Sequence, residues 1–290
     1  MVSPSFEAIC GRYLRVAIEG VPHRIYVEEA GAGIPLLCLH TAGTDSRQYR
    51  DLLNDPEVTS RYRVIAFDLP WHGKSSPPEG FQNQHYQLTE AYYLGAIMAV
   101  VNGMGLVKPV VLGCSIGGRV VLQLLLRHAD AFGAAIGLQT SRNAPGKLRA
   151  QTHETQYLDR SDVNGAEATA AWLSGIMSPH SPAAGRWETL WHYMQGGPGV
   201  FYGDTHFYRE GGDVQLEDLA RIDTRRTPLY LLTGEYDYSA TPAMTQEVAA
   251  AIPGARFSAM SNLGHFPMSE NYAVLRTYLL PVLQEIAEPA

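Results

Sequence analysis

A serine between two glycines, Ser115 in the stretch VLGCSIGG (111–118), has the setting of a reactive nucleophile. Gly113 and Gly117 stand two residues before it and two residues after it, which gives the pattern G-x-S-x-G. An apolar run precedes this pattern and an amphipathic pattern follows it, which predicts a strand, a tight turn and a helix. Such a turn lifts the serine hydroxyl clear of a sheet edge and crowds the flanking positions, so we expect that only glycine fits there. The N-terminus of the helix then favours developing negative charge.

An unassisted serine is a weak nucleophile and needs a positioned base, for which the chain offers His265 in SNLGHFPMSE (261–270). The acid that orients the imidazole is expected just after a strand, in TGEYDYSATP (233–242). We prefer Asp237 over its rival Glu235, because a few residues of loop are needed to reach the histidine. Cys114 is the better intrinsic nucleophile, but it precedes the apex of the turn, so its side chain is expected to point into the sheet.

Short apolar runs between helical patterns predict the elements that position these residues. The runs lie at 35–39, 62–67, 109–113, 134–138, 228–232 and 255–260. The helical patterns lie at 46–54, 89–102, 115–128, 241–251 and 269–287, and residues 12–29 predict an antiparallel hairpin. Continuous hydrophobicity is typical of strands buried on both faces. The fold class is therefore α/β, with a mostly parallel, doubly wound sheet.

One interval, 141–224, is far longer than a single crossover between two strands requires. It holds three of the four tryptophans, and disordered segments are rarely so aromatic. We expect an inserted helical cap at 141–224, and a core built from residues 1–140 and 225–290.

Composition excludes several classes of function. A net charge of −7 argues against nucleic-acid binding, which requires clustered Lys and Arg. The three cysteines are far apart and none belongs to a CxxC pair, a usage that suits a protein of a reducing compartment. We see neither a signal peptide nor a membrane span. The stretch HETQY at His153 lacks the second histidine of a zinc motif, and His40 and His72 are expected to stabilise loops. We therefore expect a cytoplasmic protein with a small-molecule substrate, no metal and no cofactor; the oligomeric state is left open.

Through five stretches of sequence, the chain resembles members of the α/β-hydrolase fold superfamily. The resemblance is to the serine hydrolases with an inserted cap, which include esterases, lactonases and C–C hydrolases. The five stretches are LLCLHTAGTDSRQY (36–49), AFDLPWHGKS (66–75), VLGCSIGG, TGEYDYSATP and NLGHFPMSE (262–270). The resemblance implies an oxyanion hole of two backbone N–H groups, from Ile116 and from Ala42, with Thr41 as the alternative to Ala42. The chain departs from the family at Thr41-Ala42, where a glycine usually follows the histidine, and at Trp71, where the family has glycine.

We expect a cofactor-independent serine hydrolase that cleaves a carboxylic ester or lactone with a hydrophobic or aromatic part. Hydrolysis of a C–C bond in a ring-opened keto or dienoic acid, with the same three residues, is the alternative. A catalytically inactive member that binds a ligand or partner is the alternative from another class. Candidate pocket residues are Trp71, Arg142, Trp187, Trp191, His192, Phe201 and Tyr202.

Overall fold

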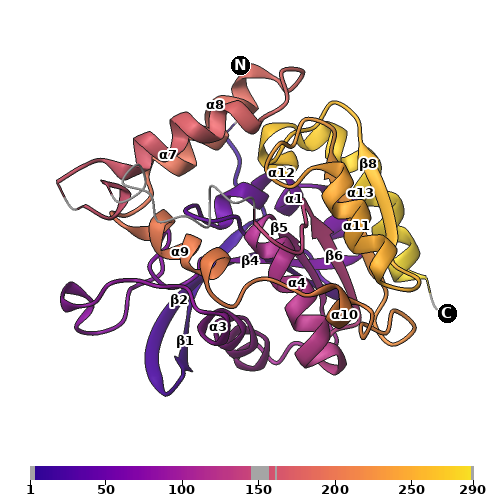
Figure 1. Ribbon diagram of the computed structural model, residues 1–290, viewed down its shortest axis with the longest axis horizontal. Helices are drawn as coiled ribbons and strands as arrows, with labels where there is room; N and C mark the ends of the chain where they lie inside the picture. The colour runs from indigo at the N-terminus through magenta and orange to yellow at the C-terminus, as the bar shows by residue number, and fades with distance from the viewer. Residues whose placement is uncertain (1–3, 145–156, 161, 289–290) are drawn as a thin grey trace.

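The computed structural model describes residues 4–144, 157–160 and 162–288 of the chain (Figure 1). Within these residues the strands form one eight-stranded sheet, in the order β1-β2-β4-β3-β5-β6-β7-β8. The strands are β1 (Cys10–Ile18), β2 (Val21–Ala30), β3 (Ile34–Leu39), β4 (Tyr62–Phe67), β5 (Val110–Cys114), β6 (Ala134–Leu138), β7 (Leu229–Gly234) and β8 (Arg256–Met260). The pairs β1·β2 and β2·β4 are antiparallel, and every pair from β4 to β8 is parallel. The predicted α/β class with a mostly parallel sheet is confirmed.

The helices predicted at 89–102, 115–128 and 241–251 are present, and each begins one residue after its predicted start. The helices of the described residues have the following bounds. They are α1 (Arg50–Leu53), α2 (Pro56–Thr59), α3 (Glu90–Gly103), α4 (Ile116–His128), α7 (Gly165–Leu173), α8 (Ala183–Met194), α9 (Val200–Arg209), α10 (Leu216–Leu219), α11 (Pro242–Ala251), α12 (Pro267–Glu270) and α13 (Tyr272–Ala287). Threonine side chains cap two of them: Thr89 accepts the N–H of Tyr92 in α3, and Thr241 accepts the N–H of Met244 in α11.

Alternate residues of the central strands face two different cores, so helices cover both faces of the sheet. In β3, Leu37 and Leu39 belong to the core that contains α3, α4 and α11. Leu36 and Cys38, one residue out of phase, belong to the core that contains α1 and α13. This burial on both faces explains why the strands are continuous apolar runs rather than alternating ones.

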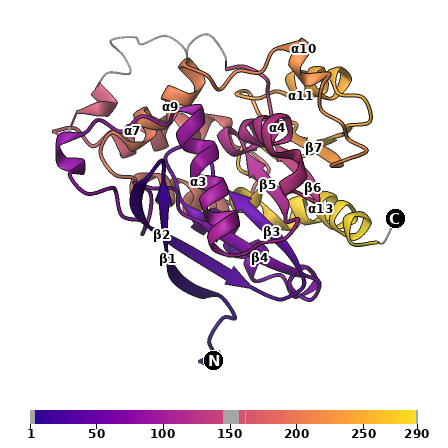
Figure 2. The ribbon, with the colours of Figure 1, turned by 90° about the horizontal axis from the view of Figure 1, so that it is seen from below.

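The hairpin predicted at 12–29 consists of β1 and β2, which lie side by side at the edge of the sheet (Figure 2). Ile18 pairs with Val21, so a two-residue turn, Glu19-Gly20, joins the strands. Both turn residues have positive φ, +50° and +81°, as the tight turns that suit twisted strands require.

Two predicted helices are interrupted. The segment 46–54 begins as a 3₁₀ turn over Ser46–Tyr49, started by the side chain of Asp45, and continues as α1. The segment 269–287 is divided at Asn271, whose extended backbone (φ −162°) ends α12. The Asn271 side chain then accepts the N–H of Val274 and starts α13.

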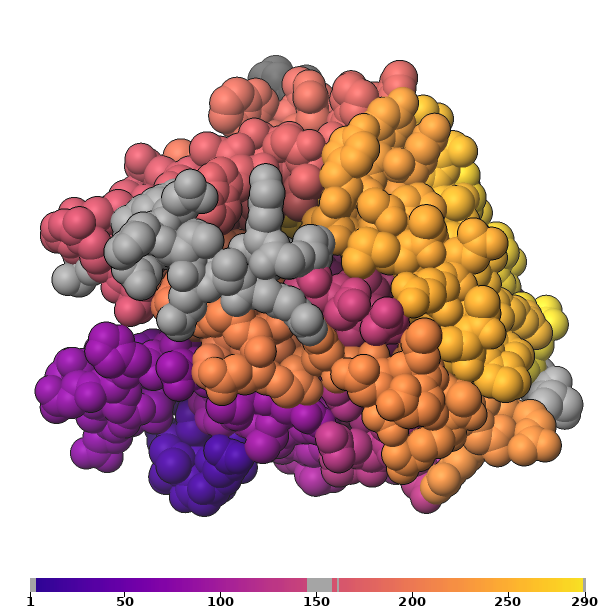
Figure 3. Space-filling view, in the orientation of Figure 1, coloured from indigo at the N-terminus to yellow at the C-terminus, as the bar shows by residue number. Residues whose placement is uncertain are grey.

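The insertion predicted at 141–224 lies between β6 and β7, and its described residues carry α7 to α10 (Figure 1). A small apolar cluster joins Ala170, Met177 and Tyr193 of the insertion to Phe266, which precedes α12. In the space-filling view, the pink surface of the insertion meets the orange-to-yellow C-terminal segments along one border (Figure 3). Among the described helices, none is both long enough and apolar enough to cross a membrane.

Candidate active site

The turn between β5 and α4 places Ser115 in a strained backbone conformation, with φ +60° and ψ −112°. The Ser115 N–H donates to the Leu138 carbonyl (2.9 Å), which ties the turn to β6. A Cβ on Gly113 would overlap the carbonyl oxygen of Gly117, and a Cβ on Gly117 would lie 2.7 Å from the carbonyl oxygen of Leu39. The crowding expected at both glycines is therefore present.

Replacing Gly117 with alanine is expected to lower the free energy of unfolding by about 1–3 kcal/mol, the usual cost of overpacking. A loss of stability would point to crowding, because alanine otherwise stabilises a helix by ~1 kcal/mol relative to glycine. Gly175→Ala is the matched control, since a Cβ there meets no heavy atom within 4 Å. Urea unfolding of both variants measures the difference. Equal free energies of unfolding for the two variants would show that the turn accommodates a Cβ at position 117.

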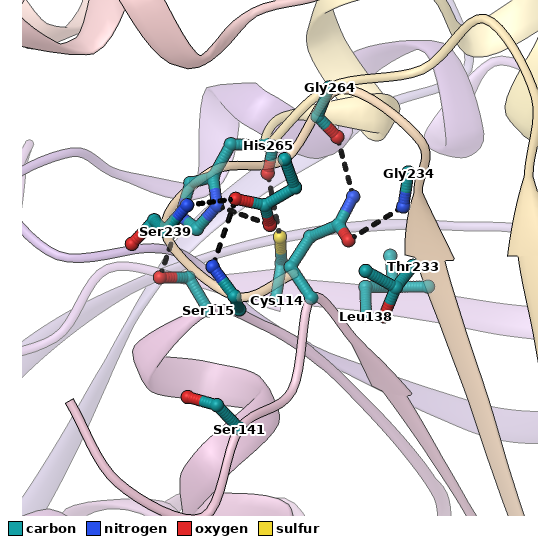
Figure 4. A network of polar contacts seen from close by, with 12 residues as sticks. Cys114, Ser115, Leu138, Ser141, Thr233, Gly234, Ser239, Gly264 and His265 are labelled. Carbon is teal, nitrogen blue, oxygen red and sulfur yellow. Dashed lines mark hydrogen bonds and ion pairs between the residues drawn. The ribbon is translucent and has the colours of Figure 1, made fainter. Parts of the chain in front are cut away.

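His265 links Ser115 to Asp237 in one chain of hydrogen bonds (Figure 4). The imidazole Nδ1 lies 2.7 Å from Asp237 Oδ2, and Nε2 lies 2.8 Å from Ser115 Oγ. Because the ionised carboxylate only accepts, the proton sits on Nδ1, and Nε2 accepts from the serine hydroxyl. The other carboxylate oxygen, Asp237 Oδ1, accepts the N–H groups of Ser239 (2.7 Å) and Ala240 (3.0 Å), which fixes its orientation.

Glu235 and Cys114, the rivals of Asp237 and Ser115, take other partners. Glu235 Oε2 accepts the N–H of Asn262 (3.1 Å), so the structure brings Asp237 and not Glu235 to the imidazole. Cys114 is fully buried, and its thiol donates to the main-chain carbonyl of His265 (3.4 Å). Burial raises the pKa of this thiol well above its usual value, which disfavours the nucleophilic thiolate.

Two buried polar side chains hold the loop that carries His265. The Gln139 amide bridges it to β7, donating to the Gly264 carbonyl (2.6 Å) and accepting the Gly234 N–H (2.9 Å) (Figure 4). The Glu270 carboxylate accepts the Gly264 N–H, and burial raises the pKa of Glu270 to about 7. The insertion also contributes, because the His265 N–H donates to the Ile176 carbonyl (2.9 Å).

In the loop after β3, some backbone N–H groups donate hydrogen bonds within the described part of the protein and one does not. The Thr41 N–H donates to Gln48 Oε1 (3.1 Å), and the Gly43 N–H donates to Asp204 Oδ2 (2.7 Å). No acceptor meets the N–H of Ala42 among the described residues. Ala42 rather than Thr41 therefore has an N–H available for a ligand, as does Ile116 in the first turn of α4.

Tyr208, which the sequence analysis did not assign to the site, lies beside the nucleophile. Its hydroxyl is 3.2 Å from Ser115 Oγ, and because Oγ already donates to His265, Tyr208 is the donor in this pair. Burial raises the pKa of Tyr208 to about 12, so the phenol keeps its proton. The Arg119 guanidinium lies over the Tyr208 ring, 4.6 Å from its centroid, and holds it in place.

Two of the predicted pocket residues are not in a pocket. Trp187 and Trp191 lie on α8 with exposed fractions of 69% and 60%. A side chain this exposed does not line an enclosed cavity, so the prediction for these two tryptophans is wrong. They stand four residues apart on the solvent face of α8, whose buried residues are Thr189, His192 and Tyr193.

The other five predicted pocket residues have varied surroundings. Trp71 has φ +75°, a backbone conformation that glycine adopts more readily than other residues, and its ring stacks on Tyr86 (5.3 Å between centroids). Arg142 pairs with Glu247 (2.9 Å). His192 is buried, which lowers its pKa to about 4.

Phe201 lies against the loop that carries Ala42, since a Cβ on Gly43 would come within 2.7 Å of its ring. The ring of Tyr202 lies instead under the guanidinium of Arg209, at 4.6 Å. Of the seven candidates, the structure thus places Phe201 against a segment of the candidate site.

Within the described residues, no group of three or more His, Cys, Asp or Glu side chains has the arrangement of a metal site. His153, which begins the HETQY stretch, lies outside these residues.

Comparison with known proteins agrees with this fold. A sequence model of the alpha/beta hydrolase family matches residues 36–276. The "Uncharacterized carboxylesterase nap" of Bacillus subtilis (strain 168) is 23% identical over 252 residues, which cover 80% of this chain and 73% of that protein. A thermophilic esterase from Thermogutta terrifontis superposes with a TM-score of 0.82 at 17% identity, over 96% of this chain and 100% of its own. The enol-lactonase of Burkholderia xenovorans LB400 superposes with a TM-score of 0.76 at 18% identity, over 93% and 99% of the two chains. The chain therefore belongs to the alpha/beta hydrolase family, and it is a hydrolase.

Proposed function

We propose that the protein is a cofactor-independent serine hydrolase that cleaves a carboxylic ester or lactone through an acyl-enzyme on Ser115. The observation that carries the proposal is the unbroken chain of hydrogen bonds from Ser115 through His265 to Asp237. The similarity to a carboxylesterase, an esterase and an enol-lactonase supports this type of substrate.

In the proposed reaction, His265 Nε2 takes the hydroxyl proton as Ser115 Oγ attacks the carbonyl carbon. Asp237 stabilises the imidazolium that forms. The imidazolium gives its proton to the oxygen of the leaving alcohol, and the C–O bond breaks to leave an ester on Oγ. A water molecule, deprotonated by His265, then attacks this ester, and Oγ leaves with the proton from Nε2.

The N–H groups of Ile116 and Ala42 are the proposed donors to the oxyanion of each tetrahedral intermediate. Both belong to backbone held in place before the substrate arrives, which is the condition for strong transition-state stabilisation. One such donor contributes on the order of 3 kcal/mol.

Residues 141–224 are proposed to form the cap over this site. The contact of the Ile176 carbonyl with the His265 N–H and the contact of Tyr208 with Ser115 support this role, because both come from the insertion. Phe201, half-buried beside Gly43, supplies aromatic surface. We therefore propose a substrate with a hydrophobic or aromatic part.

Replacing Tyr208 with phenylalanine is expected to lower kcat about 3- to 10-fold, the value of one hydrogen bond. The reason is that Oγ is the leaving group in deacylation, and the Tyr208 hydroxyl donates to it. Tyr230→Phe is the matched control, because its hydroxyl donates to Glu285 on α13. Steady-state turnover of an aryl ester measures the effect. Equal kcat values for both variants would remove Tyr208 from the mechanism.

A panel of p-nitrophenyl esters graded by acyl length, with an aromatic ester included, tests the proposed function. We expect saturable release of p-nitrophenol, with an initial burst equal to the active-site concentration where deacylation limits the rate. No ester turnover, combined with cleavage of a ring-opened dienoate, would instead establish C–C bond hydrolysis. A folded protein that does neither would be a binding module.

A further inference from the structure

A buried carboxylate of the insertion reaches the loop that carries Ala42. Asp204 lies on α9 and is completely buried. Its Oδ2 accepts the Gly43 N–H (2.7 Å) and lies 2.9 Å from His72 Nε2, while its Oδ1 accepts the hydroxyl of Tyr86 (2.7 Å). The carboxylate thus joins the loop after β3, the loop after β4 and the segment before α3.

The hydrogen-bond partners of His72 determine its charge. Nδ1 lies 2.9 Å from the Pro70 carbonyl oxygen and Nε2 lies 2.9 Å from the Asp204 carboxylate, and both partners can only accept. Both ring nitrogens must therefore donate, which makes His72 an imidazolium paired with Asp204. Burial alone lowers the pKa of His72, but the Asp204 charge, the hydrogen bonds to Asp204 and Pro70 and the Asp68 charge together more than offset it, so the pKa is raised.

The neighbouring ring of His40, 4.9 Å away between centroids, is neutral by the same reasoning. Its Nε2 accepts the Leu69 N–H (3.1 Å), so the single proton is on Nδ1, which donates to the Thr41 carbonyl (2.8 Å). Burial, followed by the charge of His72, lowers the pKa of His40 to about 4. Of the two neighbouring rings, His72 therefore carries the positive charge that pairs with Asp204, and His40 carries none.

This pair acts on the backbone on one side of Ala42, and Gln48 acts on the other. The Gly43 N–H is bound by Asp204 and the Thr41 N–H by Gln48, so the loop is anchored on both flanks of the residue whose N–H is unpaired in the described structure. The backbone on either side of Ala42 is consequently held by side chains that lie outside this loop.

We propose that Asp204 and His72 form a latch by which the insertion positions the oxyanion loop, so that the Ala42 N–H is ready to bind the oxyanion. This inference rests on the proposed function, and it makes Asp204 and His72 positioning residues rather than catalytic ones. Helix α9 then contributes two residues to the site, because Tyr208, which contacts Ser115, lies one turn after Asp204 on the same helix.

The latch predicts a dependence on pH. The groups that face His72 are Asp204 on α9, Asp68 after β4, His40 after β3 and Tyr86 before α3. A histidine with a raised pKa in the folded protein stabilises the fold below its unfolded pKa, and this contribution is lost as pH rises through the folded pKa. Deprotonation of His72 removes the positive charge that pairs with Asp204 and the N–H that donates to the Pro70 carbonyl, so the contact weakens and turnover should decline on the alkaline side.

The test measures kcat, KM and the pH–rate profile for an aryl ester in the full-length chain. Asp204→Asn should lower kcat about 10- to 100-fold, up to the effect of losing one oxyanion donor. KM should change little, because the Ala42 N–H acts most strongly in the transition state. His72→Gln should remove the alkaline decline, since the group that titrates is gone. Glu210→Gln is the matched control at the C-terminal end of α9, where the acid faces His206 and solvent, and it should leave all three measurements unchanged.

Tyr86→Phe removes only one hydrogen bond to Asp204, so it tests the latch even where Asp204→Asn fails to fold. We expect it to lower kcat about 3- to 10-fold with an unchanged KM. The latch is overturned if folded Asp204→Asn, or in its absence Tyr86→Phe together with His72→Gln, keeps the wild-type kcat and alkaline decline. Failure of the proposed function is a distinct result, because the wild type itself would then release no p-nitrophenol.

Discussion

Replacing Ser115 with alanine is expected to lower kcat for an aryl ester on the order of 10⁶-fold, the loss seen when a triad serine is removed. The alanine has no Oγ to form the acyl-enzyme, and the base His265 then has nothing to activate except water. KM and the unfolding midpoint should change little, because the turn around residue 115 is held by backbone contacts to Leu138 and by the glycines.

Cys114→Ala is the control for this experiment, since it removes the adjacent thiol and leaves Ser115 in place. Its thiol is buried and bound to the His265 carbonyl, so we expect activity within a few-fold of wild type, with a modest loss of stability. The opposite ranking, with the cysteine variant inactive and the serine variant active, would identify the wrong nucleophile.

Replacing Asp237 with asparagine is expected to lower kcat about 10⁴-fold while preserving the fold. An amide can present its NH₂ to His265 Nδ1, which favours the tautomer with the proton on Nε2. That tautomer cannot accept the proton of Ser115. The carboxylate also no longer stabilises the imidazolium, so both acylation and deacylation are slowed.

Glu235→Gln is a matched change two residues away, and it tests the rival acid. The glutamine oxygen can still accept the Asn262 N–H, so the loop should be retained and the activity should stay near wild type. Circular dichroism and urea unfolding establish that both variants fold. A larger loss for Glu235→Gln than for Asp237→Asn would contradict the assignment of the acid.

Much of the core could be predicted from the sequence because its signals are local. Gly113 and Gly117 mark a turn that few other residues can form, and the apolar runs before the turn and before Asp237 mark buried strands. The parallel sheet then brings the ends of these strands to one edge, so the three polar residues meet although they are far apart in the chain.

The contribution of α9 could not be predicted, because it depends on how the insertion packs against the core. Asp204 and Tyr208 find their partners in loops more than 80 residues away, and no local pattern specifies that pairing. One signal was available: Val200, Asp204 and Phe207 follow a helical period on the buried face, and an acidic residue on such a face needs a partner.

The tryptophans of α8 were assigned to the pocket from the sequence, but the structure places them on the surface. Aromatic residues are usually buried, so Trp187 and Trp191 were natural candidates for a pocket, yet their spacing places them together on the exposed face of the helix. Residue type was misleading there, and helical phase relative to the buried Tyr193 was the better guide.

The central claim is that Ser115 is an activated nucleophile, and intact-protein mass spectrometry after treatment with a fluorophosphonate tests it most directly. We expect one adduct per wild-type chain, on the peptide that contains Ser115, and none on Ser115→Ala. A folded wild type that gains no adduct, or a Ser115→Ala variant that is labelled equally, would contradict it.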